Sequence, residues 1–178
     1  MKIYVVRHGE TESNVKRLFQ GRINTGLNEH GIDQAIEVKN YFKDFGIDLI
    51  ISSPMNRCRE TAEIISDGKL PTTYDERLIG RDHGEFTGND REGKAFLDYW
   101  NYNKNIQYKE AESLRDLYAR SVKTFLDIKE EHKDKNKIVL VTHSGIIKSL
   151  YFYKNGLPDD GDFTKYKAKN CEILEFNI

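Results

Sequence analysis

The sequence predicts an α/β fold with a mostly parallel sheet. Apolar runs at residues 3–6, 49–51 and 138–141 have the length and composition of strands that are buried on both faces. Segments with apolar residues at helical spacing lie between these runs, and this β-α-β alternation is typical of parallel sheets. The last segment, 171–178, alternates apolar and polar residues, which indicates a strand at the edge of the sheet.

After the first predicted strand, the sequence indicates a loop and then a helix. Residues 9–30 contain several turn formers and no sustained periodicity, so we expect a polar loop with at most a short helix around 14–18. From Gly31 to Phe42, apolar residues recur at helical spacing, and Gly46 then provides a stop. This segment is the first expected crossover helix.

A second helix is expected directly after the run at 49–51. Ser53 suits the N-cap and Pro54 the first helical position, which places Arg57 in the first turn of this helix. The helix should end near Asp67 and Gly68, before a short strand at 72–74.

Glycines at 80, 84, 88 and 93 predict a loop after Leu78. An aromatic-rich helix is expected at 95–102, and we interpret residues 80–110 as a lid insert. Glu112 and Ser113 then open the longest amphipathic helix, which ends in a charged stretch at 129–137.

Composition limits the function classes that fit the chain. Its 178 residues suit one domain, 1–178, and 28 basic against 29 acidic side chains give no reason to expect nucleic acid or an anionic membrane as partner. Cys58 and Cys171 are too few for a disulfide framework, and no stretch has the length of a signal peptide or membrane span. We therefore expect a cytoplasmic protein that acts on a small molecule.

Four side chains stand at corresponding places after the predicted strands. Arg7 and His8 follow the first strand, Arg57 lies in the helix after the second, and His143 follows the run at 138–141. If these strands are parallel neighbours, the four side chains converge at the carboxyl edge of the sheet. Two guanidiniums and a protonated imidazole can hold a phosphate dianion while a neutral imidazole attacks phosphorus. No carboxylate cluster accompanies them, so we expect phosphoryl transfer without a metal ion or other cofactor.

Further motifs occur in order over nearly the whole chain. They are Arg7-His8-Gly9-Glu10-Thr11, Asn14, Gln20-Gly21, Ser52-Ser53-Pro54-Met55-Asn56-Arg57, Glu112-Ser113 and Thr142-His143-Ser144-Gly145. Together they resemble those of the histidine phosphatase superfamily, specifically its phosphoglycerate-mutase-like branch. The resemblance implies a three-layer α/β/α sandwich; with the pattern above, we expect a mostly parallel central sheet and an antiparallel edge strand.

The resemblance also implies roles for individual residues. His8 would be the nucleophile that forms a phosphohistidine, and Arg7, Arg57 and His143 would complete the phosphate pocket. The expected binding residues for substrate or phosphate oxygens are Asn14, Gln20, Gly21 and Ser144.

One position departs from the pattern of this branch. Its members place a proton-donating glutamate two residues after an Arg-Leu pair, and here Arg77-Leu78 is followed at that distance by Gly80. The candidates for a displaced general acid are Glu85, our first choice, and the alternatives His83 and Asp82. A carboxyl group beside a phosphate dianion has its pKa raised by like charge, so it can serve as a donor near neutral pH.

These features predict a phosphomonoesterase that acts on a small phosphorylated metabolite and works best on esters with good leaving groups, because general acid catalysis matters least for them. Two alternatives stay open. One is a mutase-type phosphotransferase, although the insert has no adjacent arginine pair of the kind that grips a glycerate carboxylate in mutases. The other is a protein that binds a phosphorylated ligand without turning it over, because Gly80 removes the acid. The substrate and the oligomeric state are not predicted.

Overall fold

The computed structural model describes residues 1–178, and a five-stranded sheet forms its centre. The strands lie in the order β3-β2-β4-β1-β5, and β5 pairs antiparallel with β1 while all other pairs are parallel. Their bounds are β1 Lys2–Arg7, β2 Leu49–Ser52, β3 Thr72–Tyr74, β4 Lys137–Thr142 and β5 Ile173–Asn177. The predicted fold class, with its antiparallel edge strand, is confirmed.

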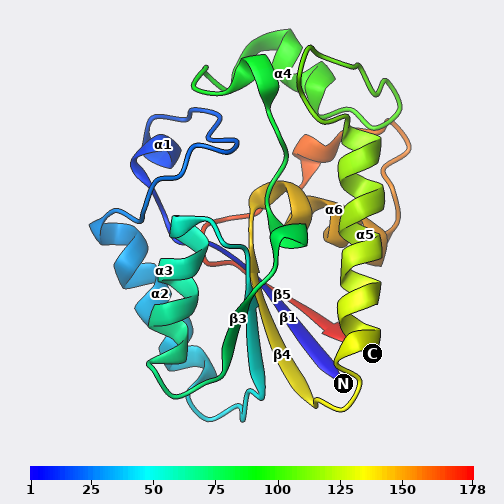
Figure 1. The fold of residues 1–178 in the computed structure, drawn as a ribbon. Coiled ribbons are helices and arrows are strands. Elements are labelled where there is room, and N and C mark those ends of the chain that lie inside the picture. Colours follow the sequence, from blue (N-terminus) through cyan, green and yellow to red (C-terminus); the bar gives the residue numbers. More distant parts are fainter.

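Helices cover both faces of the sheet and produce three layers (Figure 1). On one face lie α2 (Glu29–Phe42) and α3 (Asn56–Ser66), and on the other lie α5 (Leu114–Glu131) and α6 (Ser144–Asn155). Two separate apolar clusters fill the spaces between these layers. The remaining helical segments are short: α1 (Glu12–Val15), α4 (Gly93–Tyr99) and the 3₁₀ turns Glu76–Leu78, Gly84–Phe86 and Phe163–Lys165.

The start of α3 differs from the predicted one. Met55 is the N-cap and Asn56 the first helical residue, so the expected cap at Ser53 is wrong by two residues. The Ser53 hydroxyl instead lies 2.9 Å from Nε2 of His143 and so contributes to the site at the strand ends. Arg57 nevertheless lies in the first turn of the helix, as predicted.

The loop after β1 packs tightly against the beginning of α2. A Cβ atom added to Gly9 would lie 2.4 Å from the Gly31 carbonyl oxygen, and one added to Gly31 would lie 2.1 Å from the Glu10 carbonyl oxygen. Both contacts are with backbone atoms, so only glycine allows this approach. The two glycines therefore fix where the loop that follows His8 lies on the sheet edge.

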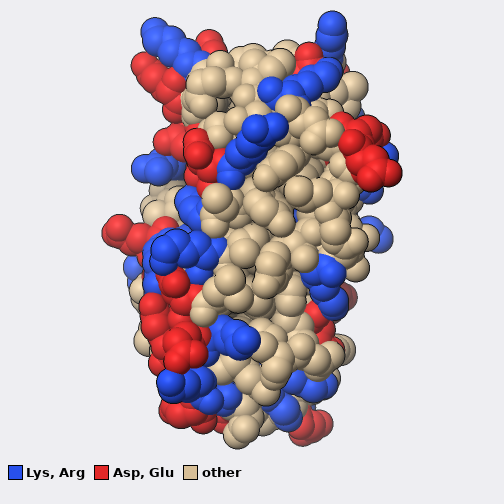
Figure 2. All heavy atoms as spheres, turned by 90° about the vertical axis from the view of Figure 1, so that its right-hand side faces the viewer, with Lys and Arg blue, Asp and Glu red and all other residues tan.

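The insert lies above the carboxyl ends of the strands, where α4 forms part of the top of the molecule (Figure 1). Backbone pairing holds it there, because Phe19 N donates to Asn89 O and Arg91 N donates to Arg17 O. None of the helices combines the length and the apolar character that a membrane span requires. On the side of the molecule that carries α5, basic and acidic side chains lie next to one another (Figure 2), as in the 2.6 Å ion pair of Lys123 with Asp127.

Candidate active site

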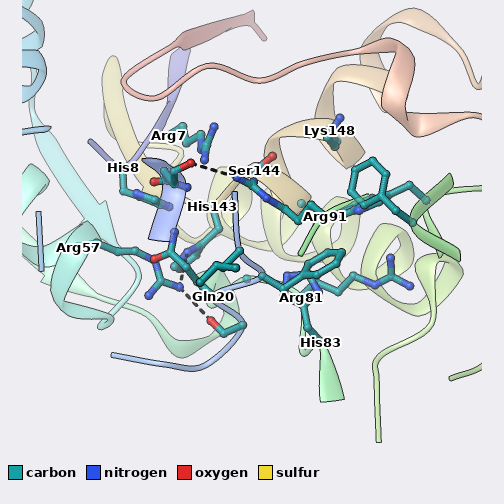
Figure 3. A pocket seen from close by; sticks show the side chains of 18 residues that line it. Arg7, His8, Gln20, Arg57, Arg81, His83, Arg91, His143, Ser144 and Lys148 are labelled. Atoms are coloured by element: carbon teal, nitrogen blue, oxygen red, sulfur yellow. Dashed lines mark hydrogen bonds between the residues drawn. The ribbon is translucent and has the colours of Figure 1, made fainter. Parts of the chain in front are cut away.

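A pocket opens at the carboxyl ends of β1, β2 and β4, and it brings together the four residues predicted to converge there (Figure 3). No aspartate or glutamate lines it. The lining residues are Arg7, His8, Asn14, Leu18, Phe19, Gln20, Gly21, Arg57, Gly80, Arg81, His83, Arg91, Phe96, Trp100, His143, Ser144, Gly145 and Lys148. The result is a pocket with many positive groups and no acidic side chain.

His8 is buried at the end of β1, and its ring has a defined donor side. Its Nδ1 lies 2.7 Å from the Gly9 carbonyl oxygen. Because a carbonyl oxygen only accepts, the proton resides on Nδ1 and the lone pair of Nε2 is free. Burial, followed by the charges of Arg7 and Arg57, lowers the pKa of His8 well below 6.5. At neutral pH the ring is therefore an uncharged imidazole, which is the form that can attack phosphorus.

Two arginines flank this ring from different elements. Arg7 ends β1 and donates from Nη1 to the Ala168 carbonyl oxygen at 2.7 Å. Arg57, in the first turn of α3, donates to the carbonyl oxygens of Ile23 at 2.8 Å and Gly21 at 3.0 Å. The Nε atoms of both arginines are buried without a partner, and neither side chain pairs with a carboxylate. Burial lowers the pKa of Arg7 to about 10, and both arginines keep positive charge at pH 7.

His143 follows β4 and is also neutral. Arg57 Nη2 lies 3.2 Å from its Nδ1 and Ser53 Oγ lies 2.9 Å from its Nε2; because a guanidinium only donates, Nδ1 accepts and Nε2 carries the proton. Burial first, then Arg57 and His8, lowers its pKa well below 6.5. Without a bound anion, burial and the neighbouring cations thus favour the neutral ring over the protonated imidazole that we expect to hold a phosphate dianion. A bound phosphate dianion would raise this pKa again.

Gly80 lies directly against the His143 ring. A Cβ atom at this position would lie 2.9 Å from Cγ of His143, closer than side-chain atoms pack, so any other residue requires the ring to move. The glycine therefore does more than remove a carboxylic acid. It allows the imidazole to rest on the backbone of the loop that follows the 3₁₀ turn Glu76–Leu78.

The predicted substrate-binding residues also line the pocket: Asn14, Gln20, Gly21 and Ser144. The amide oxygen of Asn14 accepts from the Thr11 N–H and from the side chain of Asn170, both at 3.2 Å. Ser144 is the first residue of α6, where unpaired backbone N–H groups and the helix dipole favour an anion.

Of the three candidates for the general acid, only His83 lines the pocket. Glu85 is exposed and accepts a hydrogen bond from the Lys109 N–H at 3.1 Å. Asp82 pairs with Arg22 at 3.1 Å and accepts from the Gly84 N–H at 3.0 Å. The structure therefore does not bring our first choice, Glu85, to the site, because the turn Gly84–Phe86 directs it to the outside. His83 Nδ1 lies 2.9 Å from the Tyr99 hydroxyl, and burial lowers its pKa to about 3.

Three further cations in the pocket were not predicted. Arg81 and Arg91 come from the insert and Lys148 from α6. The arginine pair of the mutases is adjacent in sequence, whereas Arg81 and Arg91 are ten positions apart and only the fold brings both to one pocket. The signal that could have found Arg81 is its place directly after Gly80, the position that should carry the acid.

Comparison with known families identifies one model over almost the whole chain. The model of the histidine phosphatase superfamily (branch 1) matches residues 3–178. Relatives include the uncharacterized phosphatase PhoE of Bacillus subtilis, 34% identical over 149 residues, which are 83% of this chain and 74% of the relative. The adenosylcobalamin/alpha-ribazole phosphatase of Salmonella typhimurium is 29% identical over 84% of this chain and 77% of its own.

Solved structures show the same fold. Bacillus stearothermophilus YhfR superposes with a TM-score of 0.88 and 26% identity over 99% of this chain and 91% of its own. A mutant phosphoserine phosphatase from Entamoeba histolytica, in complex with phosphoserine, superposes with a TM-score of 0.86 and 25% identity over 99% and 90% of the two chains.

Proposed function

The chain belongs to the histidine phosphatase superfamily (branch 1), and on this premise we propose that it hydrolyses a small phosphomonoester through a phosphohistidine on His8. Phosphatase-named relatives support the phosphatase activity. The observation that carries the finer proposal is the His8 ring itself. Its Nδ1 proton is held by the Gly9 carbonyl at 2.7 Å, so the free Nε2 lone pair belongs to a neutral imidazole among cations.

In the first step, Nε2 of His8 attacks phosphorus and the bond between phosphorus and the ester oxygen breaks. Arg7 and Arg57, which have no carboxylate partner, hold the phosphoryl oxygens, and the N-terminus of α6 adds backbone N–H donors at Ser144. When the phosphate dianion enters, His143 donates a hydrogen bond to it, either as a neutral ring through the Nε2 proton or after the ring has gained a second proton. In the second step, water attacks the phosphohistidine, the N–P bond breaks and inorganic phosphate leaves.

The leaving oxygen needs a proton or a stable negative charge. No carboxyl group lines the pocket, so we infer that His83 is the only one of the three candidate side chains placed to supply a proton, and only after an anion has raised its pKa. General acid catalysis contributes about 10²- to 10⁴-fold, least for leaving groups that depart as anions. The enzyme should therefore prefer esters of acidic alcohols.

A phosphoenzyme assay tests the proposal. After mixing with p-nitrophenyl phosphate, the wild type should release p-nitrophenol and carry an acid-labile, alkali-stable phosphoryl group, and His8→Ala should do neither. A series of aryl and alkyl phosphates should show rates that rise steeply as the pKa of the leaving alcohol falls. Equal rates across the series would contradict a weakened acid, and a phosphoryl group on another residue would contradict His8 as nucleophile.

The absence of a carboxylic acid at Gly80 also favours a second function, a protein that binds a phosphorylated ligand without turnover. The same assay separates the two functions. Phosphate binding without release of p-nitrophenol or formation of a phosphoenzyme would support the binding protein. Transfer of the phosphoryl group to a second phosphoglycerate, in place of water, would identify a mutase.

A further inference from the structure

We propose that the substrate carries a second anionic group, a carboxylate or another phosphate, on the part of the molecule that leaves. It would be held by an outer subsite formed by Arg81, His83, Arg91 and Lys148. The inference rests on the proposed function for the position of the reacting phosphate at His8, and it extends that function to the class of substrate.

The first argument is the pairing of charge. Many surface cations lie beside acidic side chains, as the ion pairs of Lys123 with Asp127 and Arg77 with Glu131 illustrate, and a cation without such a partner, such as Lys94, is exposed to water. In the pocket, by contrast, neither Arg81, Arg91 nor Lys148 has a carboxylate within ion-pair distance. One phosphate dianion already has Arg7 and Arg57. The additional cations therefore exceed what one phosphate needs, and buried charges without counter-ions are costly.

Arg81 gives the sharpest indication of a ligand. Its side chain is 2% exposed, and it lies over the Tyr99 ring with Cζ 3.5 Å from the ring centroid. Nε donates to the Glu112 carbonyl and Nη1 to the Tyr99 carbonyl, both at 2.9 Å, while Nη2 is buried without any partner. The guanidinium is thus rigidly positioned, and one of its three nitrogens is left to donate to a bound anion.

The other members surround the same volume. Burial, followed by the charges of Arg81 and Arg91, lowers the pKa of His83 to about 3. Nζ of Lys148 and Cζ of Arg81 both face the Trp100 ring, at 5.7 and 5.0 Å from its centroid. Burial and the charge of Arg7 lower the pKa of Lys148 to about 8. In Figure 3, these four residues lie to one side of Arg7, His8, Arg57 and His143.

The position of the subsite explains which part of the substrate it binds. Arg81 stacks on the ring of Tyr99 in the insert, and His83 Nδ1 lies 2.9 Å from the Tyr99 hydroxyl, so both side chains lie on the insert side of the pocket (Figure 3). These two side chains therefore meet the remainder of the ester. Arg91 and Lys148 lie nearer to Arg7, because, next to burial, the charge of Arg91 lowers the pKa of Arg7 and the charge of Arg7 lowers the pKa of Lys148. A leaving group with its own negative charge would be stabilised there, which compensates in part for the missing acid at Gly80.

A binding experiment tests the inference without depending on turnover. We would titrate the enzyme with propylphosphonate, 3-phosphonopropanoate and ethane-1,2-diyl bisphosphonate, which carry a methyl, carboxylate or second phosphonate group at the end of the same two-carbon spacer. The wild type should bind at least one of the two doubly charged compounds about 10- to 100-fold more tightly than propylphosphonate. The carboxylate and bisphosphonate arms show which anion the subsite takes. Equal affinities for all three would overturn the inference.

Variants locate the effect. Arg81→Gln and Arg91→Gln should each reduce the affinity ratio severalfold. Because Arg91 is only half-buried, we expect Arg91→Gln to fold and to test the subsite even if Arg81→Gln does not fold. Arg77→Gln is the control, because its guanidinium pairs with Asp75 and Glu131 outside the pocket, and it should leave the ratio unchanged. A ratio unaffected by either pocket variant would overturn the assignment.

Turnover separates this inference from the proposed function. The wild type should hydrolyse 3-carboxyphenyl phosphate or a bisphosphate with a higher kcat/KM than phenyl phosphate. If the enzyme hydrolyses phenyl phosphate but prefers no doubly charged compound in either assay, the proposed second anionic group is refuted and the phosphatase activity is not. Tight binding of the doubly charged phosphonates without hydrolysis of any ester refutes the phosphatase and leaves the subsite intact.

Discussion

The pocket has two halves that hold positive charge in different ways. Around His8, the charges come from strand ends and helix starts, so the sheet fixes their positions. In the outer subsite, Arg81 and Arg91 come from loop segments, and their positions depend on local contacts such as the stacking of Arg81 on Tyr99. The difference teaches that the sheet topology fixes the half around His8, whereas the outer half depends on the path of the insert.

A second contrast, between two arginines on either side of Gly80, supports this interpretation. Arg77 pairs with Asp75 at 2.7 Å and with Glu131 at 2.8 Å, and these partners raise its pKa. Arg81 is buried among carbonyl groups without a carboxylate, and burial lowers its pKa to about 10. Arg77 has its counter-ions within the protein, whereas Arg81 has none, as we expect for a side chain that binds an anionic ligand.

The largest effect should come from the half around His8. Replacing the nucleophile, His8→Ala, should reduce kcat/KM by at least about 10³-fold for phenyl phosphate and 3-carboxyphenyl phosphate alike, because no phosphohistidine forms. Steady-state kinetics on the two esters check this. A variant that lost activity on only one of them would break the distinction between the halves.

Gly80→Ala should have the next largest effect. The new Cβ lies 2.9 Å from the His143 ring and displaces it, and a misplacement of about 1 Å can cost about 10²-fold in turnover. Both esters should be affected, since His143 belongs to the half around His8. Gly46→Ala is the control for an added Cβ without a collision, because no atom lies within 4 Å of its Cβ position. Its positive φ of 64° makes alanine strained there, so this variant should lose stability but keep its kcat. An unchanged kcat in Gly80→Ala would show that the ring position is unimportant.

The outer subsite should be visible in the pH dependence of stability. The pKa of His83 is about 3 in the folded chain, below the ordinary 6.5, so on acidification the unfolded state takes up the proton first and stability falls. From about pH 7 to about pH 5, this histidine should lower the free energy of unfolding by about 2 kcal/mol. Denaturant unfolding of wild type and His83→Gln measures it: the decrease should be smaller in the variant by this amount. Equal decreases would show that His83 is not held neutral.

Salt should produce the smallest effect. Raising NaCl from about 50 to about 500 mM screens charge, and it should increase KM severalfold more for 3-carboxyphenyl phosphate than for phenyl phosphate, since only the former uses both halves. Arg91→Gln should reduce this difference. Parallel increases in KM for the two esters in the wild type would indicate that the outer cations do not contact the substrate.

Much of the fold and half of the pocket could be predicted from local patterns. Buried strands are recognisable as apolar runs in the sequence. Residues directly after parallel strands lie at one edge of the sheet, and this brings together Arg7, His8, Arg57 and His143. The outer subsite could not be predicted in this way, because no periodicity encodes the path of the loop that brings Arg81 and Arg91 near His83. The position of Glu85 outside the pocket could not be predicted for the same reason, since the 3₁₀ turn Gly84–Phe86 decides which side chains face the pocket.

The close contact of Gly9 with Gly31 has a consequence for how this chain can diverge. Neither glycine lines the pocket, yet a Cβ at either one would collide with the backbone of the other segment at 2.1 to 2.4 Å. Repacking of side chains cannot relieve such a collision, so a substitution must shift either the end of β1 or the start of α2. Proteins that evolve from this chain and keep His8 in place should therefore keep both glycines. Arg81 and Arg91, by contrast, should be able to change as the substrate changes.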